Sequence, residues 1–234
     1  KKNHKMKFST RISYLIGEDK LQSLSHKHVA VFGVGGVGSF VCEALVRSGI
    51  EELSIIDFDI IDITNLNRQL MTNTHNIGKK KVDVLKDRLI AIVPELKIHV
   101  YPLYFESKDQ FDFSNIDYVV DAIDHVPSKI ELLKTCDEFN IPFIMALGTA
   151  RKLDPTKLCV SKLSKTSVDP LAKKIRLIAR KEKLADCKVV FSTEEARPIT
   201  RVEEDKLING SMIFVPASAG LLIAQQVIMD LVSL

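Results

Sequence analysis

Short β-branched runs alternate with amphipathic stretches through the first two thirds of the chain. Continuous apolar runs of this kind are typical of strands in a parallel sheet, where helices cover both faces. The stretches between them carry apolar residues at the i, i+3, i+4 spacing of a helix. Such alternation predicts a doubly wound, Rossmann-like α/β fold, with a mainly parallel sheet and helices on both faces. The pattern predicts strands within 28–32, 52–59, 97–105, 116–124 and 141–148, and helices over 39–47, 79–92 and 127–138.

The pattern changes after Gly148, where short strands, turn residues and charged residues are mixed. A basic helix is predicted over 170–184, and an apolar helix over 216–234 that would pack on the sheet or against a second subunit. Because no linker or repeat separates this part, we expect it to extend the same fold as a mixed C-terminal part. The expected organisation is a flexible tail (1–10) and a single domain (11–234), made of a core (11–150) and a C-terminal extension (151–234).

Composition excludes several classes of protein. Of 234 residues, 46% are hydrophobic and 27% are charged, which excludes a largely disordered chain. No apolar run approaches the ~20 residues of a membrane span, and no apolar core follows the basic N-terminus, so neither a span nor a signal peptide is expected. We expect neither disulfides nor zinc, and a reducing, cytoplasmic location, because the cysteines never form a CxxC pair. They are Cys42, Cys136, Cys159 and Cys187.

Charge is segregated along the chain. The net charge is only +3, but residues 151–183 hold 11 Lys or Arg against 3 Asp or Glu. Concentrated positive charge of this kind favours a polyanionic partner. The solvated face of a helix would give the same pattern, so charge alone does not separate the two interpretations.

A glycine-rich turn follows the first strand and precedes a helix. Gly33, Gly35 and Gly38 fit G-x-G-x-x-G, with Gly36 between them. Glycines let the backbone approach a phosphate, and a helix N-terminus offers free N–H groups to it. Asp57 lies 24 residues beyond Gly33, at a strand end where a carboxylate can accept hydrogen bonds from a ribose. The motif predicts a nucleotide site, and a nicotinamide or flavin dinucleotide is the first interpretation.

Charged and polar residues near the ends of the strands favour a triphosphate over a redox dinucleotide. Cations offset charge on a transferring phosphoryl group, and a carboxylate can hold Mg²⁺. Each such residue alone would more often be a surface charge, but together they fall near the carboxyl ends of the predicted strands. These residues are Asp59, Asn65, Arg68, Lys81 and Asp124.

The motifs GVGGVG, DFD, NLNRQ, IGKKK and DAID occur in the order found in the adenylating domain of ubiquitin-activating-type enzymes, which this chain resembles. The resemblance implies a single ATP-binding adenylation domain over 11–234, with the glycine loop and Asp57 on the nucleotide and Asp59 close by. It implies phosphate contacts from a polar and basic group, Asn65, Arg68 and Lys81.

The same resemblance implies two further roles. Asp124 would hold Mg²⁺, and Arg11, in RISYLIG, would enter the nucleotide site of the partner in a homodimer. The residues implied to be catalytic are Arg11, Arg68, Lys81 and Asp124.

The second half resembles one subfamily, the tRNA threonylcarbamoyladenosine dehydratases, through LDPTKLCVSKLSKTSVDPLAKKIR and VVFSTEEARP. This implies that the basic extension faces tRNA that carries threonylcarbamoyladenosine, with salt-sensitive binding to its phosphates. In the implied reaction, the threonyl carboxylate is adenylated by ATP with release of pyrophosphate. A nucleophile of the same side chain then closes a ring and expels AMP, so no enzyme nucleophile is needed.

Cysteine and histidine chemistry is expected to be minor. Cys187 lies near the VVFSTEE motif, but its sequence neighbours do little to lower its pKa, and we expect no thioester role. Cys42 and Cys136 are expected to fill the core. His125 is expected to line the site without acting as a base, and the other five histidines show no ligand spacing. The KTSVDPL turn is a candidate for a monovalent cation, and a sulfur-transfer protein is a candidate partner.

Three other functions stay open at this point. Adenylation of the C-terminus of a small sulfur-carrier or ubiquitin-like protein would use the same ATP site, although those sulfur-carrier enzymes usually carry two CxxC pairs. An NAD-binding oxidoreductase is favoured only by the glycine loop and predicts no release of pyrophosphate. A non-catalytic tRNA-binding module would use ATP only to set its shape.

Overall fold

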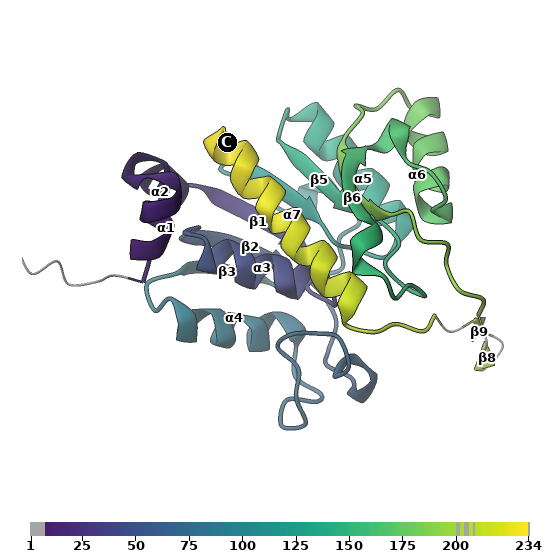
Figure 1. The fold of residues 1–234 in the computed structure, drawn as a ribbon, viewed down its shortest axis with the longest axis horizontal. Helices are drawn as coiled ribbons and strands as arrows, with labels where there is room; N and C mark the ends of the chain where they lie inside the picture. The colour runs from purple at the N-terminus through teal and green to yellow at the C-terminus, as the bar shows by residue number, and fades with distance from the viewer. Residues whose placement is uncertain (1–7, 200–201, 204–205, 208, 234) are drawn as a thin grey trace, which may run out of the picture.

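The computed structural model describes residues 8–199, 202–203, 206–207 and 209–233. Its centre is a seven-stranded sheet in the order β3-β2-β1-β4-β5-β7-β6 (Figure 1). Neighbouring strands are parallel except for β6, which runs antiparallel to β7 at one edge. The predicted mainly parallel, doubly wound fold is confirmed. The strands are β1 (His28–Phe32), β2 (Glu52–Ile56), β3 (Lys97–Tyr101), β4 (Tyr118–Asp121), β5 (Phe143–Ala146), β6 (Leu158–Lys162) and β7 (Lys188–Ser192), with a separate pair β8 (Val202–Glu203) and β9 (Lys206–Leu207).

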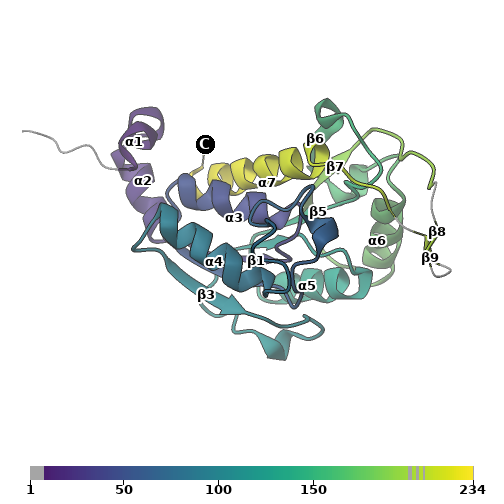
Figure 2. The same cartoon turned by 90° about the horizontal axis from the view of Figure 1, so that it is seen from below.

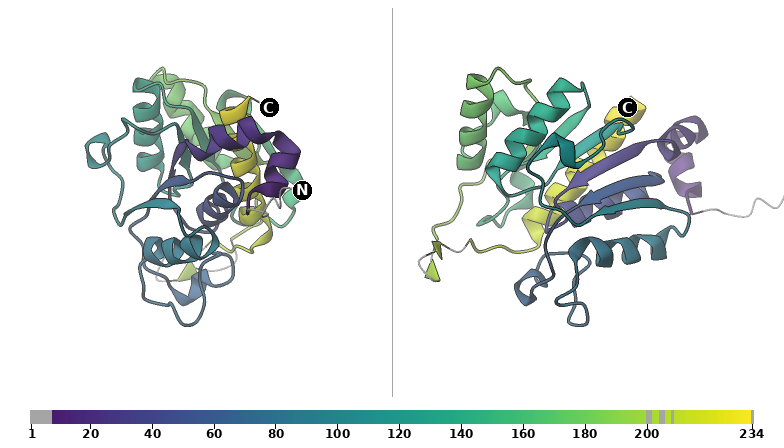
Figure 3. Two further views of the ribbon diagram at one scale, coloured as in Figure 1. Left: turned by 90° about the vertical axis from the view of Figure 1, so that its left-hand side faces the viewer. Right: turned by 180° about the vertical axis from the view of Figure 1, so that it is seen from behind.

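Helices cover both faces of the sheet, as Figure 3 shows from two further sides. Helices α3 (Gly38–Arg47), α4 (Lys81–Ile92) and α7 (Phe214–Val232) contribute to one hydrophobic core, and α5 (Val126–Glu138) and α6 (Pro170–Lys181) to the other. Helices α1 (Thr10–Ile16) and α2 (Glu18–Ser25) precede β1. Short 3-10 turns are η1 (Ile63–Asn65), η2 (Lys108–Gln110), η3 (Pro155–Lys157) and η4 (Leu163–Lys165).

The two cores follow from the alternation of side chains along each strand. In β1, Val29 and Val31 belong to the core beneath α3 and α7, whereas Ala30 and Phe32 belong to the core beneath α5. All four are fully buried. Continuous burial of this kind explains why the sequence of β1 shows an unbroken apolar run rather than alternation.

Helix α7 is the one helix among the described residues that is long and apolar enough, by length and composition, to cross a membrane. Here it packs beside α3 and contributes Ala219, Ile223 and Val227 to the core (Figures 1 and 2). A Cβ at Gly220 would lie 2.6 Å from the carbonyl oxygen of Val37, so the two helices touch closely. The segment packs on the sheet, which is one of the two alternatives predicted for it, and its helix begins at Phe214 rather than at residue 216.

Several boundaries differ from the prediction for local reasons. The strand predicted over 52–59 ends at Ile56, and the side chain of Asp57, which follows, accepts hydrogen bonds from the backbone N–H groups of Val34 and Asp59. The basic helix ends at Lys181, and Lys183 has a positive φ of 57° that a helix does not allow. Helix α1 begins at Thr10, inside the predicted tail, and residues 1–7 of that tail lie outside the described part of the chain.

Candidate active site

A cavity of about 650 Å³ lies beside the carboxyl ends of β1, β2, β4 and β5. Open α/β sheets place ligands at this edge, where the loops that follow the strands meet. The cavity is lined by most of the residues that the sequence predicts to bind a nucleotide. These are Gly33, Gly35, Gly36, Asp57, Asp59, Asn65, Arg68, Lys81 and Asp124.

The glycine loop is tied to the second strand through Asp57. Its Oδ2 accepts a hydrogen bond from the backbone N–H of Val34 at 2.8 Å, and its Oδ1 accepts one from Asp59 N–H at 2.9 Å. Burial raises the pKa of the Asp57 carboxyl, although the two backbone N–H groups oppose this shift. Asp57 therefore shapes the loop as well as offering a carboxylate to the cavity.

Gly38 differs from the other three glycines because it does not line the cavity. A Cβ at this position would lie only 1.8 Å from the carbonyl oxygen of Gly33, so any side chain would collide with the turn itself. Gly33 has a φ of +85°, which favours glycine. The structure thus packs Gly38 against the glycine turn, and its predicted contact with the nucleotide stays a prediction.

Two of the predicted cationic side chains line the cavity, and only one of them is paired with a carboxylate among the described residues. Lys81, at the start of α4, has a side chain only 6% exposed, and its Nζ lies 2.6 Å from Asp59 Oδ2. Arg68 donates from Nη1 to the Thr64 carbonyl oxygen at 2.8 Å and to Asn67 Oδ1 at 2.9 Å. These bonds hold the guanidinium without a carboxylate partner among the described residues, so its charge is available to an anion.

Asn65 is buried at the end of η1. Its side-chain oxygen accepts a hydrogen bond from Asp62 N–H at 3.0 Å, while the Asp62 carboxylate caps the same turn through Thr64 N–H. This reciprocal capping box fixes the short turn that leads to Arg68. Asn65 lines the cavity and also sets the position of the segment around it.

Asp124 is exposed in the loop after β4, and its carboxylate makes no hydrogen bond or ion pair with any residue that the structure describes. A buried pair supports this loop from below. Lys129 Nζ lies 3.0 Å from Asp121 Oδ2 with both side chains fully buried, and it donates to the Ile123 carbonyl oxygen at 2.8 Å. Asp121 Oδ1 also accepts from Ile123 N–H at 3.0 Å. Hydrogen bonds therefore fix both the N–H and the carbonyl group of Ile123, which directly precedes Asp124 in this loop.

The second half of the chain supplies part of the cavity wall that sequence reasoning did not assign. Lys152 Nζ donates to the Gly148 carbonyl oxygen at 2.8 Å and lies 3.2 Å from Asp169 Oδ2, and both side chains are almost fully buried. Asp169 also caps α6, accepting from Ala172 N–H at 3.0 Å. Asp169 followed by Pro170 is a helix-start signal, but it does not show that this helix start borders the nucleotide cavity.

An aromatic wall borders the same cavity. The rings of Phe58 and Tyr104 lie edge to face at 4.7 Å, and Tyr104 lies 5.4 Å from the ring of His125. His125 Nδ1 is 3.0 Å from Ser128 Oγ, which itself donates to the Phe105 carbonyl oxygen. His125 lines the cavity, as the sequence analysis predicted.

Two groups of predicted residues lie away from the cavity. Arg11 is exposed on α1, at the edge of the sheet where β1 begins, and does not line the cavity of its own chain (Figure 1). Cys42 and Cys136 are buried in the two cores, as predicted. Cys187 is also buried, and burial raises its pKa to about 12, so its thiol stays protonated.

Comparisons with known proteins agree with this geometry. A family model described as the ThiF family matches residues 8–232. The tRNA threonylcarbamoyladenosine dehydratase of Bacillus subtilis is 39% identical over 237 residues, which cover 95% of this chain and 93% of that protein. The protein of the same name from Haemophilus influenzae is 41% identical over 182 residues, covering 77% and 69% respectively. The solved structure of the Escherichia coli tRNA N6-threonylcarbamoyladenosine dehydratase in complex with ATP gives a TM-score of 0.86 at 32% identity, covering 95% of this chain and 93% of that one.

Proposed function

Because this chain belongs to the ThiF family, we propose that it is an ATP-dependent tRNA threonylcarbamoyladenosine dehydratase. The observation that carries the proposal is the convergence of Arg68, Lys81 and Asp124 on one cavity beside the glycine loop. A similar chain of that name has been solved with ATP, and the similarity covers nearly the whole of both chains. A redox dinucleotide would not need this group of cations and acid beside its phosphates.

The proposed reaction has two steps on the tRNA side chain. A carboxylate oxygen of the threonyl group attacks the α-phosphorus of ATP, and the bond to pyrophosphate breaks. A nucleophile of the same side chain then attacks the activated acyl carbon, and the carbon–oxygen bond to AMP breaks. Ring closure gains from proximity because both reacting groups belong to one side chain. The sum is loss of one water from the modified base, driven by cleavage of ATP.

The residues of the cavity suit the first step. Arg68 and Lys81 would stabilise the negative charge that develops on the α-phosphate and the leaving pyrophosphate. Entry of a phosphate would compete with Asp59 for the Lys81 ammonium, since the two side chains already form an ion pair. Asp57 would accept hydrogen bonds from the ribose while holding the glycine loop through Val34.

A magnesium ion fits the free carboxylate of Asp124. Mg²⁺ in nucleotide sites is typically held by one or two carboxylates together with substrate phosphates and water. Asp124 lines the cavity, and no described side chain neutralises it. A bound Mg²⁺ would supply charge neutralisation on the phosphates, and Lys129 and Asp121 would keep the Asp124 loop in place for it.

The basic face of α6 would receive the tRNA backbone. The helix starts at the cavity, where Asp169, Pro170 and Leu171 line the wall. Its basic face is formed by Lys173 and Lys174, which are exposed near the start of the helix. Phosphate contacts from exposed lysines give affinity without sequence specificity. The aromatic wall of Phe58 and Tyr104 offers surfaces on which an unstacked base can pack.

A homodimer would complete the site. Arg11 does not line the cavity of its own chain, and its neighbours Tyr14 and Leu15 on α1 are 79% and 85% exposed. An arginine beside exposed apolar side chains suits an interface that delivers a cation to a second cavity. We also propose a sulfur-transfer protein as a partner, a cytoplasmic location and a monovalent cation near the KTSVDPL turn. At this turn, Asp169 is paired with Lys152.

The proposal is tested by following ATP consumption with tRNA that bears the open threonylcarbamoyl group. Equal amounts of AMP and pyrophosphate should form, and the modified nucleoside should lose ~18 Da, the mass of one water. Asp124→Ala should abolish both, whereas Asp87→Ala, at an exposed position of α4, should change neither. ATP binding without tRNA-dependent turnover would contradict the proposal and direct the search to small proteins with a free C-terminal carboxylate.

A further inference from the structure

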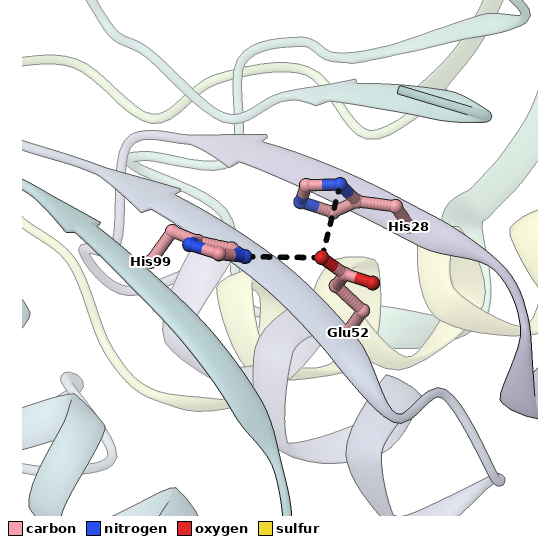
Figure 4. A group of neighbouring side chains, drawn as sticks. All are labelled: His28, Glu52 and His99. Carbon is pink, nitrogen blue, oxygen red and sulfur yellow. Dashed lines mark hydrogen bonds and ion pairs between the residues drawn. The ribbon is translucent and has the colours of Figure 1, made fainter. Parts of the chain in front are cut away.

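Three side chains with metal-binding groups meet near the amino-terminal ends of β1 and β2, at the opposite end of these strands from the ATP cavity. His28 and Glu52 begin β1 and β2 and are partners in the strand register, and His99 lies on β3 opposite Ser54 (Figure 4). One potential ligand atom from each of the three lies within 4.8 Å of the other two. Four strand steps, about 13 Å, separate His28 from Phe32 at the start of the glycine loop, and none of the three residues lines the ATP cavity.

We propose that His28, Glu52 and His99 bind a divalent transition-metal ion of the zinc class. Two imidazoles and one carboxylate, with a fourth position left to water, form a donor set that zinc accepts. A tetrahedral ion with bonds of about 2.1 Å places its ligand atoms about 3.4 Å apart. His99 Nε2 lies 3.1 Å from Glu52 Oε1, and His28 Nδ1 lies 3.7 Å from the same oxygen, so two of the three separations are close to this value.

The orientation of His28 supports a metal ligand rather than a simple hydrogen bond. Its Nε2 lies 2.9 Å from Ser54 Oγ, on a side chain that is almost fully buried. In the tautomer with Nε2–H donating to the Ser54 hydroxyl, Nδ1 carries the lone pair that faces Glu52, at 3.7 Å and too far for a hydrogen bond. Metal-bound histidines are commonly held in this way through the nitrogen that does not bind the metal. An ion between Nδ1 and the carboxylate would satisfy both groups.

The neighbouring charges allow a cation to enter. Lys97 Nζ lies 4.0 Å from the other carboxylate oxygen, Glu52 Oε2, but its side chain is 74% exposed and free to move into solvent. Lys27 is held by Asp117 at 3.1 Å, and Asp117 also accepts from the backbone N–H of His28 at 2.8 Å. The backbone at His28 is therefore fixed, while His99 is exposed and open to solvent.

The test uses the full chain without an affinity tag, stripped with a chelator, in excess Mg²⁺ and without ATP or tRNA. Zn²⁺ is titrated against a chromophoric chelator, and Co²⁺ is followed by its visible absorption. We expect one tight equivalent, weakened at least about tenfold by Glu52→Gln, His99→Gln and Ser54→Ala. His75→Gln, an exposed histidine away from the group, should bind as the wild type does. Equal affinity in all variants, or equal loss in His75→Gln, would overturn the proposal.

Two further measurements separate a lost ligand from a damaged fold. The unfolding temperature of each variant in chelator reports any damage to the fold, and Zn²⁺ at a fixed concentration should raise the unfolding temperature of the wild type and His75→Gln by more than that of the three weakened variants. X-ray absorption of the zinc-loaded wild type needs no variant, and it should show two imidazole ligands with the remainder oxygen. A sulfur ligand, or oxygen ligands alone, would contradict the site. Because the test contains neither ATP nor tRNA, a failure to bind zinc would not count against the proposed dehydratase activity.

Discussion

Lys81 Nζ lies 2.6 Å from Asp59 Oδ2 at the start of α4, so the buried ammonium of the cavity has a counter-ion before any nucleotide enters. The backbone repeats the connection, since Lys81 N–H donates to the Asp59 carbonyl oxygen at 3.0 Å. This double link fixes a cation that could not otherwise be buried without a large cost. A buried and paired ammonium suits the phosphate site that we propose, because electrostatic stabilisation is most effective in a preorganised site.

Replacing Lys81 with methionine keeps the length of the side chain and removes its charge. We expect kcat for tRNA-dependent AMP formation to fall by about 10²–10³-fold, the usual effect of losing one preorganised charge or donor. Lys86→Met, on the same helix and outside the cavity lining, should keep kcat within about twofold of wild type. A loss of similar size in both variants would show that helix stability, and not charge in the cavity, is responsible.

The glycine loop predicts opposite outcomes at two positions. A Cβ at Gly35 meets only Gln69 Nε2 at 3.6 Å, an ordinary contact, but it projects into the nucleotide cavity. Gly35→Ala should therefore fold normally and lose ATP affinity. Gly38→Ala should destabilise the fold, because its Cβ would collide with Gly33 at 1.8 Å.

Thermal unfolding and ATP titration of the same samples separate the two effects. Gly210→Ala is the control, since a Cβ there meets nothing within 4 Å. Normal stability of Gly38→Ala would contradict the packing role given to that residue.

Cys187 should be dispensable for turnover. Burial raises the pKa of its thiol to about 12, so thiolate is scarce at neutral pH, and the thiolate is the nucleophile. Cys187→Ala should retain kcat within about twofold, with only a modest loss of stability from the smaller side chain. Single-turnover mixtures quenched in acid should contain no covalent enzyme–tRNA adduct. An adduct that disappears in this variant would establish a thioester route instead.

Asp230, which links α7 to Tyr118 on β4 and Lys188 on β7, gives a pH-dependent prediction. Burial opposes ionisation of Asp230, but hydrogen bonds from Lys188, Tyr118 and Gln226 outweigh it and hold the pKa of Asp230 below its ordinary value. A lowered folded-state pKa adds stability above the unfolded pKa of about 3.9, and this is lost as pH falls through the folded-state value.

Asp230→Asn should therefore lower the free energy of unfolding at pH 7 by about 1.5–3 kcal/mol, the range for hydrogen bonds to a charged group. The difference from wild type should shrink below about pH 4. Urea unfolding at several pH values measures both, with Asp87→Asn as the exposed control. A difference that is constant with pH would show that the carboxylate charge is not the source.

The basic face of α6 is tested by reversing two charges. Lys173→Glu with Lys174→Glu should weaken tRNA binding and lower the slope of log affinity against log salt by about 2, or one unit for each lost phosphate contact. Lys20→Glu, on α2 at the other end of the molecule, should leave the slope unchanged. Binding of ATP alone should be the same in all three proteins. An unchanged slope in the α6 variant would move the tRNA surface elsewhere.

Local signals were enough to predict the elements that position the site. The apolar run of β1, the glycine turn and the acid at the end of β2 lie close together in sequence, and the structure keeps them together. The alternation of strands and helices was enough to predict which strand ends meet, because parallel strands end at one edge.

Contacts that depend on register or on distant segments could not be predicted in this way. Lys152 and Asp169 are 17 residues apart and come from two different loops, one after β5 and one directly before α6. His28, Glu52 and His99 come from three strands, and only the pairing of those strands shows that their side chains share a face. Spacing along the chain, which led us to expect no zinc and no histidine ligands, contains no information on such a group.

The central claim is that the threonyl carboxylate attacks the α-phosphorus of ATP. It is tested most directly by labelling both oxygens of that carboxylate with ¹⁸O in the substrate tRNA and analysing the products by mass spectrometry. Attack at the α-phosphorus followed by ring closure predicts AMP that carries one ¹⁸O and pyrophosphate that carries none. Labelled inorganic phosphate together with ADP would show attack at the γ-phosphorus, and unlabelled AMP would show that the carboxylate is never adenylated.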